Sequence, residues 1–312
     1  MTNIHLLADI GGTNARFALG DGQRIYAIQT LPTADYPTLQ DAIRAYLQAQ
    51  NETVAQAAIA IANPITGDHI QMTNCHWQFS ISALQRELQL EKLHLINDFT
   101  AQALAIPRLT ATEKRQVRAG EGVAGTPLAV IGPGTGLGVS ALIPNGDRWL
   151  ALTSEGGHVS LAPYNDAELA IWQYARALHG HVSAERLING AGLSLIDSAL
   201  ANINNDVSDR SPAEITAAAL AGEARARAVL DHFCALLATV TADLVLTLGA
   251  RGGVYLCGGI LPRIADYLIN DSPFNARFTD KGRLKSYLDT VPVWLVTADN
   301  PGLVGVAETL RD

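Results

Sequence analysis

The chain has 312 residues and a net charge of 22 − 30 = −8, a length that suits two domains of ordinary size. An acidic balance without a basic block argues against a nucleic-acid or anionic-membrane surface. The longest mostly apolar stretch, residues 235–248, contains Asp243 and falls short of a membrane span, and Asp9 and Arg16 interrupt the apolar N-terminal stretch before it can resemble a signal peptide.

The chain opens with apolar runs that predict a β-meander. The runs at residues 4–10, 15–19 and 24–29 are separated by turn signals at Gly11-Gly12 and Asp21-Gly22. Farther along, apolar spacing and turn signals predict helices over 36–50, 81–88 and 99–106 and strands over 57–62 and 93–96.

A polar, glycine-containing segment at residues 110–127 marks the expected domain boundary. The pattern beyond it predicts strands over 129–142 (a pair), 148–152, 253–257 and 293–296 and helices over 166–178, 193–200, 213–221, 223–248 and 302–310.

The first glycine turn is the most informative local feature. The run LLADIGGTNARFAL turns through Gly11, Gly12, Thr13 and Asn14 between two apolar strands. Such a turn presents backbone N–H groups and a hydroxyl to a phosphate. Asp9, at the tip of the first strand, is placed to hold a metal ion that bridges phosphates.

A second turn repeats the first one in AVIGPGTGLGVSAL, and aligning Gly12-Thr13 with Gly134-Thr135 gives an offset of 134 − 12 = 122 residues. An ordinary hairpin explains either turn alone, but the repeat resembles the actin-like ATPase fold. That fold has two related α/β domains around a central cleft, with one phosphate turn from each. No glycine-rich loop here ends in Gly-Lys-Ser/Thr, and the second turn does not follow G-x-G-x-x-G, so P-loop and Rossmann interpretations fail.

Asn97 and Asp98 follow a predicted buried strand and precede a predicted helix. A carboxylate there faces the edge of an open α/β sheet where ligands bind, and Asp98 is a candidate general base. The alternative is that Asp98 merely caps the following helix.

Four more segments in the second half carry polar or glycine-rich patterns. Glu155-Gly156-Gly157-His158 combines acceptors and donors that suit sugar hydroxyls, with glycines that let backbone approach a ligand, although a polar turn would look the same. Ser183 and Arg186 indicate a capped helix with Glu185 in its first turn. Gly258-Gly259 could lie against a flat base or simply form a strand-to-helix turn, and Asn300-Pro301-Gly302 is interpreted as a hinge or helix start without chemistry.

Together these segments resemble the bacterial ATP-dependent glucokinases, the hexokinase branch of the actin-like superfamily. The matching segments are ADIGGTNARFAL, IANPITGD, MTNCHWQFS, LINDFTAQALAIP, GPGTGLGV, SEGGHVSLAP, GHVSAERLINGAGL, GGVYLCGGILPR and DNPGLVGVA. Ala8 and Pro133 stand where the family often has glycine and alanine. Ala162-Pro163-Tyr164 follows His158 with no cysteine nearby, which is typical of the zinc-free branch rather than the repressor–kinase branch.

The resemblance implies ATP- and Mg²⁺-dependent phosphorylation of glucose in the cytoplasm, at the entry to glycolysis, by a homodimer. It makes Asp98 the base and Asn97, Asp98, Glu155, His158 and Glu185 the sugar ligands. It implies that Asp9 holds Mg²⁺, through water, and that the nucleotide contacts are Ala8, Asp9, Ile10, Gly11, Gly12, Thr13, Asn14, Gly134, Thr135, Gly136, Gly258 and Gly259. The predicted domains are 1–109 plus 299–312, where the last helix returns to the first domain, and 110–298.

Three rival functions fit the same motifs. A kinase for another hexose or an amino sugar cannot be separated from a glucokinase by these residues. A sugar-sensing regulator usually carries an N-terminal helix-turn-helix, whereas the first strand here begins by Ile4, so direct DNA binding is not expected. A polymerising or chaperone ATPase would need additional segments that the pattern does not indicate.

Overall fold

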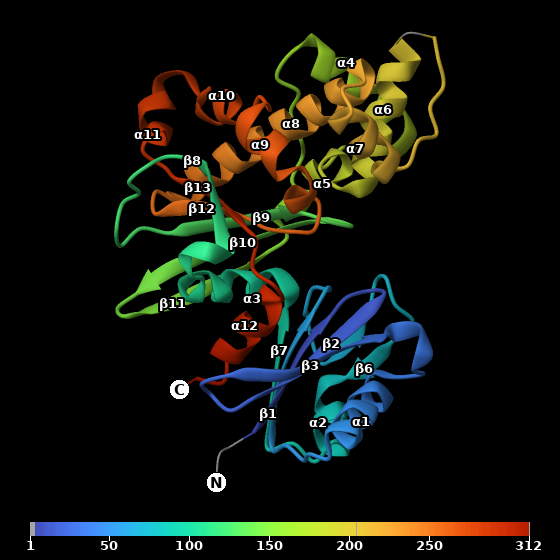
Figure 1. Ribbon diagram of the computed structural model, residues 1–312, viewed down its shortest axis with the longest axis vertical. Coiled ribbons are helices and arrows are strands. Elements are labelled where there is room, and N and C mark those ends of the chain that lie inside the picture. The colour runs from blue at the N-terminus through green and yellow to red at the C-terminus, as the bar shows by residue number, and fades with distance from the viewer. Residues whose placement is uncertain (1–3, 204, 312) are drawn as a thin grey trace. The chain divides into compact units, whose positions relative to one another are not determined.

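The computed structural model describes residues 4–203 and 205–311, so the end residues 1–3 and 312 of the predicted domains lie outside the described residues. The chain divides into two compact units: Met1–Leu109 with Ala298–Asp312 (the first unit), and Thr110–Thr297 (the second unit). Each unit is a layered α/β structure and is described by itself (Figure 1).

The first unit is built on a sheet with strand order β3-β2-β1-β4-β7. Antiparallel pairing joins β1 to β2 and β2 to β3, which confirms the predicted meander, and parallel pairing joins β1 to β4 and β4 to β7. The strands are β1 (His5–Ile10), β2 (Asn14–Gly20), β3 (Ile25–Pro32), β4 (Gln56–Ile61) and β7 (Lys92–Asn97).

Side chains alternate along each strand, so the central strands contribute to an apolar cluster on each face of the sheet. Leu6, Ala8 and Ile10 of β1 enter one apolar cluster, and Leu7 enters another. The elements that accompany the sheet are α1 (Leu39–Gln50), the hairpin β5 (His69–Gln71) and β6 (Gln78–Ser80), α2 (Ile81–Glu87), α3 (Asp98–Ala105) and α12 (Pro301–Glu308). Helix α1 begins at Leu39, later than expected, because Thr38 caps it by accepting a hydrogen bond from Asp41 N.

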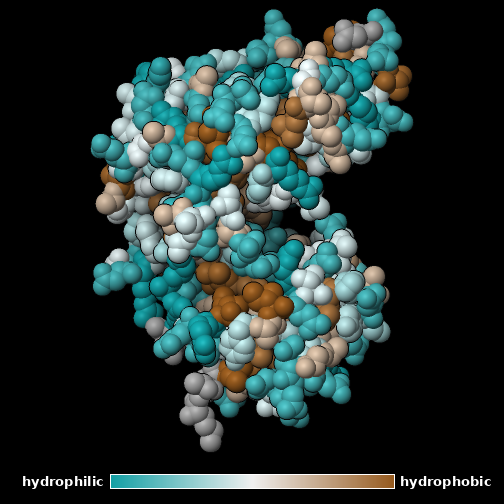
Figure 2. Space-filling view, in the orientation of Figure 1, coloured by the Kyte–Doolittle hydropathy of each residue, from teal (hydrophilic) through white to brown (hydrophobic). Residues whose placement is uncertain are grey.

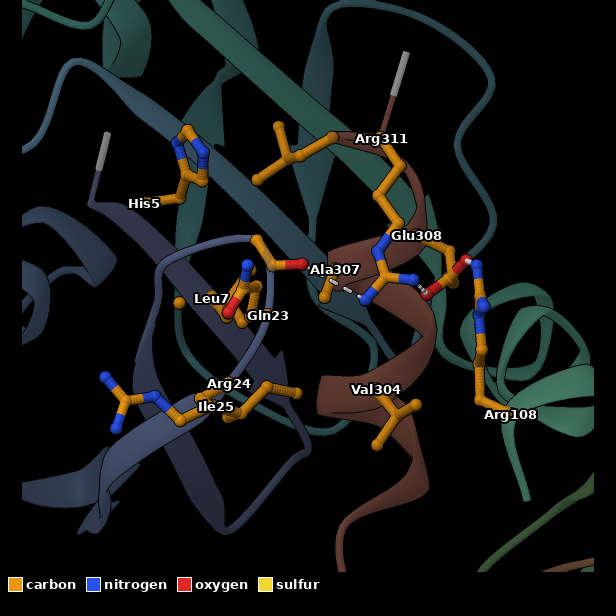
Figure 3. A pocket seen from close by; sticks show the side chains of 13 residues that line it. His5, Leu7, Gln23, Arg24, Ile25, Arg108, Val304, Ala307, Glu308 and Arg311 are labelled. Carbon is orange, nitrogen blue, oxygen red and sulfur yellow. Dashed lines mark hydrogen bonds and ion pairs between the residues drawn. The ribbon is translucent and has the colours of Figure 1, made fainter. Parts of the chain in front are cut away.

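Helix α12 packs against α3, and ion pairs fix its C-terminal end (Figure 1). Glu308 lies 2.7 Å from Arg108 Nη2 and 3.1 Å from Arg311 Nη1, while Arg311 Nη2 donates to Gly22 O at 3.2 Å. These contacts border a cavity of about 310 Å³ with apolar walls that include Leu7, Ile25 and Leu310 (Figure 3). Figure 2 shows hydrophobic side chains at the surface over the region of α12.

The sheet of the second unit repeats the scheme of the first, with strand order β11-β10-β9-β12-β13-β8. The pairs β9–β10 and β10–β11 are antiparallel, like β1–β2 and β2–β3. The pairs β9–β12 and β12–β13 are parallel, like β1–β4 and β4–β7. The strands are β9 (Leu128–Pro133), β10 (Leu137–Asn145), β11 (Arg148–Ser154), β12 (Gly253–Leu256), β13 (Val293–Val296) and β8 (Lys114–Arg118). The two related sheets confirm the predicted fold class.

Strand β8 was not predicted, because its sequence KRQVR reads as part of a polar boundary segment. It pairs antiparallel with β13 at the end of the sheet, where Val117 alone among its side chains is buried. An end strand that hydrogen-bonds on one side tolerates such polar composition.

The remaining elements of the second unit are mainly helical. They are α4 (Asp166–His179), α5 (Ala184–Leu187), α6 (Gly190–Ile203), α7 (Pro212–Leu220), α8 (Ala224–Leu248), α9 (Ala265–Asn270), α10 (Phe274–Thr279) and α11 (Lys285–Asp289). Short 3₁₀ turns in the chain are η1 (Thr33–Asp35), η2 (Ile106–Arg108), η3 (Ala111–Glu113), η4 (Gly156–His158), η5 (Leu261–Ile264) and η6 (Gly282–Leu284). Helix α6 begins at Gly190, before the expected residue 193. Gly190 and Gly192 disfavour a helix, so the sequence pattern did not indicate its first turn.

Helix α8 corrects one sequence expectation. Over its 25 residues it is long and apolar enough to cross a membrane, whereas the apolar stretch at 235–248 was expected to fall short. Within the fold, however, 67% of its most apolar window is buried. Its side chains, among them Leu230, Phe233 and Leu237, belong to the core of the second unit, as expected of a core helix.

Candidate active site

The first glycine turn lies between β1 and β2 and is held by a residue that the sequence analysis missed. Ile10 pairs with Ala15, so the turn comprises the four residues Gly11 to Asn14, and Gly11 N donates to Asn14 O at 2.9 Å. Thr33 binds it twice: its N–H donates to Thr13 O at 3.0 Å and its Oγ1 to Gly12 O at 2.9 Å. The carbonyl groups of Gly12, Thr13 and Asn14 are thereby occupied. No local motif marks Thr33 for this task, since the contact joins residues 21 positions apart.

Asp9 is the candidate metal-binding carboxylate at this turn. Its neighbours Ala8 and Ile10 are fully buried, and their side chains belong to the core of the first unit. Arg16 Nη1 lies 3.9 Å from Asp9 Oδ2, and partial burial raises the pKa of Asp9 above its ordinary value despite that guanidinium. The long ion pair with Arg16 therefore does not offset the cost of burying the carboxylate.

Gly302 makes room for Asp9, although the sequence analysis gave the Asn300-Pro301-Gly302 segment no chemistry. A Cβ at Gly302 would lie 2.8 Å from Asp9 Oδ2. Gly302 is in the first turn of α12. The start of this helix therefore sets the space available to the carboxylate.

The second glycine turn is one residue shorter than the first one. Pro133 pairs with Leu137, which leaves the three residues Gly134, Thr135 and Gly136 in the turn. Gly134 N donates to Gly136 O at 2.8 Å, and Gly190 N, at the start of α6, donates to Gly134 O at 3.0 Å. Ala15 and Leu137, which follow the two turns, are therefore 122 residues apart, as in the predicted repeat. Ile10 and Pro133, which precede the turns, are 123 residues apart.

Beside this turn lies a cavity of about 770 Å³. It is lined by Gly134, Thr135, Gly190, Ala191, Leu193, Pro212, Ala213, Thr216, Ala217, Leu220, Gly259, Ile260 and Arg263. The sequence analysis found the turn and Gly259 but missed the lining from α6 and α7 and Arg263. The small residues of PAEITAAAL in α7 were a signal, because they leave room beside a helix.

Gly258 and Gly259 differ in what surrounds them. A Cβ at Gly258, where φ is +85°, would lie 2.3 Å from Pro133 O, so this glycine packs against the end of β9. Gly259 has open space beside its Cα and lines the cavity. Of the two predicted nucleotide contacts, Gly259 therefore faces space that a ligand can fill.

Asn97 is the last residue of β7 and Asp98 is the first residue of α3. Their roles differ from one of the two alternatives that the sequence left open for Asp98. Asn97 is the N-cap, because its Oδ1 accepts hydrogen bonds from Phe99 N at 2.8 Å and Thr100 N at 3.2 Å. The alternative that Asp98 provides the cap is wrong: Asp98 is already inside the first turn, with Oδ1 accepting from Phe99 N at 2.9 Å.

The second unit brings Glu155, His158 and Glu185 together. His158 Nε2 lies 3.9 Å from Glu155 Oε2, and His158 Nδ1 lies 3.8 Å from Glu185 Oε1. As predicted, Ser183 caps α5 and Glu185 occupies its first turn. Hydrogen bonds from Leu161 N to Val182 O and from Ala184 N to Val159 O join the segment after His158 to the start of α5. Two segments distant in sequence thus present acceptor and donor groups at one place.

The glycine pair between Glu155 and His158 packs against β10, which corrects the expectation that it approaches a ligand. A Cβ at Gly157 would lie 2.1 Å from Leu137 O, and a Cβ at Gly156 would lie 2.8 Å from a methyl carbon of Val139. The pair therefore lets Glu155 and His158 sit directly beside the strand that follows the second glycine turn.

Comparisons with known proteins give one answer over nearly the whole chain. The family model described as glucokinase matches residues 6–312. A glucokinase from Chromobacterium violaceum is 53% identical over 311 residues, which are 98% of this chain and 89% of that protein.

Solved structures agree with this match. A glucokinase from an Antarctic psychrotroph has a TM-score of 0.88 at 37% identity, covering 100% of this chain and 99% of that one. A ROK family glucokinase from Streptomyces griseus, solved with glucose and AMPPNP, has a TM-score of 0.66 at 19% identity, covers 98% of each chain and is similar in fold alone. With the family model spanning almost the full length and a relative sharing half of its residues, the chain belongs to the glucokinase family.

Proposed function

We propose that this member of the glucokinase family transfers the γ-phosphoryl group of ATP to the 6-hydroxyl of glucose, giving glucose 6-phosphate and ADP. The observation that carries the proposal is the group of Glu155, His158 and Glu185 beside the second glycine turn. Carboxylates and an imidazole supply the acceptors and donors that sugar hydroxyls need. Backbone N–H groups at the adjacent turn suit a phosphate.

Asp98 is the proposed general base, with Asn97 as a further sugar ligand. Asp98 would accept the proton of the 6-hydroxyl as that oxygen bonds to the γ-phosphorus and the bond from phosphorus to the β,γ-bridging oxygen breaks. Phosphoryl transfer has a loose transition state, so the base mainly orients the nucleophile. Asn97 caps α3 and so holds the backbone that carries Asp98, which supports a positioning role besides any contact with sugar.

The nucleotide is proposed to use the two glycine turns and the cavity beside the second turn. Gly259 and the small residues of α7 leave space for a base and ribose. Helix α6 begins at Gly190 next to the turn, so the positive end of its dipole lies there and favours a phosphate. The proposed contacts from the first turn are Ala8, Asp9, Ile10, Gly11, Gly12, Thr13 and Asn14, with Ala8 and Ile10 contributing backbone.

Asp9 fits the role of a Mg²⁺ ligand through water. Mg²⁺ typically binds one or two carboxylates together with substrate phosphates. The Asp9 carboxylate, whose pKa burial raises, has an arginine only at 3.9 Å and would gain from a nearby cation. When bound, the ion supplies charge neutralisation at the β- and γ-phosphates.

The biological setting is also part of the proposal. We infer a cytoplasmic location from the family resemblance and from the burial of the apolar helix α8 inside its unit. We infer a homodimer from the family resemblance alone. Light scattering on the purified protein measures the mass and tests the dimer directly.

The proposed function is tested by ATP-dependent phosphorylation across glucose, mannose, fructose, glucosamine and N-acetylmannosamine, with Mg²⁺ and with EDTA. We expect turnover on glucose that EDTA abolishes. Preference for another sugar would support the proposed kinase activity but contradict glucose as the substrate. No turnover on any sugar would contradict the proposal and favour a sugar-sensing regulator on the same fold.

A further inference from the structure

Glu185 contacts the second glycine turn as well as the proposed sugar ligand His158. Its Oε2 accepts a hydrogen bond at 2.8 Å from the backbone N–H of Leu137, the first residue of β10 after the turn. Its Oε1 lies 3.8 Å from His158 Nδ1. One carboxylate therefore faces the nucleotide turn with one oxygen and the sugar ligands with the other oxygen.

The turn is shaped to accept this carboxylate. A Cβ at Gly136 would lie 2.5 Å from Glu185 Oε2, so a side chain at that position would displace the carboxylate. Gly134, two residues earlier, has open space beside its Cα. The turn is fixed at its start by Gly190 N and at its end by Glu185.

The position of Glu185 is itself well defined. Its side chain is 28% exposed, and the residue lies in the first turn of a helix that Ser183 caps through a hydrogen bond from Arg186 N at 3.2 Å. Ala184 N donates to Val159 O at 2.9 Å, which joins the residue before Glu185 to the residue after His158. The carboxylate thus lies between the two segments, hydrogen-bonded to Leu137 N and 3.8 Å from the His158 ring.

We propose that Glu185 couples sugar binding to nucleotide binding, an inference that rests on the proposed function of the site. A sugar hydroxyl that donates to Oε1 fixes the carboxylate, which in turn holds Leu137 N–H and keeps the turn in the shape that receives phosphate. Coupling free energies are reciprocal, so nucleotide bound at the turn strengthens sugar binding by the same factor.

The direct test measures binding of AMPPNP with Mg²⁺ by calorimetry, in the absence of sugar, to the native protein, Glu185→Ala and Glu185→Gln. Both variants remove the negative charge, so its repulsion of phosphate cancels in the comparison between them. Glutamine keeps an oxygen that can accept from Leu137 N–H, and alanine does not. We expect Glu185→Ala to bind AMPPNP about three- to tenfold more weakly than Glu185→Gln, the effect of one lost hydrogen bond.

His158→Ala is the matched control for loss of a sugar ligand. His158 belongs to the same group, and its side chain makes no hydrogen bond to the turn among the described residues. We expect this variant to bind glucose more weakly and AMPPNP with native affinity. If Glu185→Ala and Glu185→Gln bind AMPPNP equally, Glu185 is a sugar ligand only and the coupling proposal is overturned.

The reciprocal test measures glucose binding without nucleotide to Gly136→Ala and Gly134→Ala. The added methyl group at residue 136 meets Glu185 Oε2, whereas the one at residue 134 meets open space. We expect at least about threefold weaker glucose binding for Gly136→Ala, again the scale of one weakened hydrogen bond, and native affinity for Gly134→Ala. Equal glucose affinity in the two variants would overturn the coupling.

Failure of the coupling and failure of the proposed function give different results. A native protein that binds neither glucose nor AMPPNP refutes the function itself. A native protein that binds both, with AMPPNP affinity the same in both Glu185 variants, refutes only the coupling. Circular dichroism of each variant checks that the comparison is made on folded protein.

Discussion

Asp98 and Asn97 are neighbours with separate tasks at the end of β7. Asn97 uses its side chain to cap α3, and Asp98 lies in the first helical turn, partly exposed. The cap fixes the first turn of α3 and with it the backbone of Asp98, whose Oδ1 also accepts from Phe99 N. A carboxylate held this way is suited to orient a hydroxyl nucleophile.

The substitution Asp98→Asn tests this residue most directly. We expect kcat to fall by about 10²–10⁴-fold while glucose still binds, because the amide cannot accept the proton. Steady-state kinetics and calorimetry with glucose measure the two effects. Glu91→Gln, an exposed acid just before β7, is the matched control with native kinetics. Near-native turnover of Asp98→Asn would remove Asp98 from the role of base.

The substitution Asp9→Asn tests a trade-off between stability and function. Burial raises the pKa of Asp9, so the folded state holds this proton more tightly than the unfolded state. The free energy of unfolding therefore falls as pH rises from the ordinary value of 3.8 through the raised folded pKa, and the loss persists at neutral pH. Asparagine avoids that loss, so we expect a gain on the order of 1 kcal/mol at pH 7, the size typical of single substitutions.

Urea unfolding at pH 7 and at pH 3 measures the expected gain and its disappearance at acid pH. The same variant should bind MgATP about 10–100-fold more weakly, as changes at water-mediated metal partners typically do. If Asp9→Asn is no more stable than the native protein at pH 7, the predicted cost of burying the charged Asp9 carboxylate is contradicted. If it binds MgATP with native affinity, the proposed role of Asp9 as a Mg²⁺ ligand is contradicted.

At the scale of elements, the packing of α12 depends on two of its glycines, which have different neighbours. A Cβ at Gly305 would lie 1.7 Å from the backbone oxygen of Ala101 in α3. A Cβ at Gly302 would instead meet the Asp9 side chain at 2.8 Å. The backbone of a helix cannot yield as a side chain does, so the two positions should respond differently to alanine.

We expect Gly305→Ala to lower the free energy of unfolding by about 1–3 kcal/mol, the usual effect of overpacking. Gly302→Ala should cost little stability but weaken MgATP binding, because it displaces the Asp9 carboxylate. Urea unfolding and nucleotide titration on both variants separate the two effects. The idea fails if Gly302→Ala is the more destabilising of the two, or if Gly305→Ala alone affects MgATP.

The elements themselves were largely predictable where the local pattern is strong. Strand β13 was predicted at its observed bounds, and the apolar runs around the two glycine turns predicted β1, β2 and the start of β9 within one residue, while β10 ends three residues beyond the predicted 142. Strand β8 and the hairpin β5–β6 were missed, because polar residues form a strand there only by pairing with a distant partner or with each other.

At the scale of the molecule, each unit has its own apolar clusters: one cluster forms the core of the second unit, and two flank the sheet of the first unit. The proposed sugar ligands Glu155, His158 and Glu185 all belong to the second unit, and Asp98 belongs to the first unit. A ligand that binds only the folded chain raises the free energy of unfolding by an amount that grows with the logarithm of its concentration relative to Kd.

Thermal unfolding with glucose at a hundredfold excess over Kd should show stabilisation of about 2.7 kcal/mol. His158→Ala should lose this glucose effect and keep the stabilisation by AMPPNP with Mg²⁺, because its side chain belongs to the sugar group. L-Glucose, which has the same groups in mirror-image arrangement, should give none. Stabilisation by L-glucose equal to that by D-glucose would contradict a specific sugar site.

By itself the sequence determined the two strand–turn–strand repeats, the α/β class, the capped helix that carries Glu185 and the family of the chain. These features depend on residues that are near one another along the chain, through periodicity, turn chemistry and capping. Only the tertiary structure decided that Asn97 rather than Asp98 caps α3, that Thr33 holds the first turn, that α7 lines a cavity and that Glu185 binds Leu137 N–H. Glu185 and Leu137 are 48 residues apart, and such contacts are set by how packed elements meet, which no local pattern of residues contains.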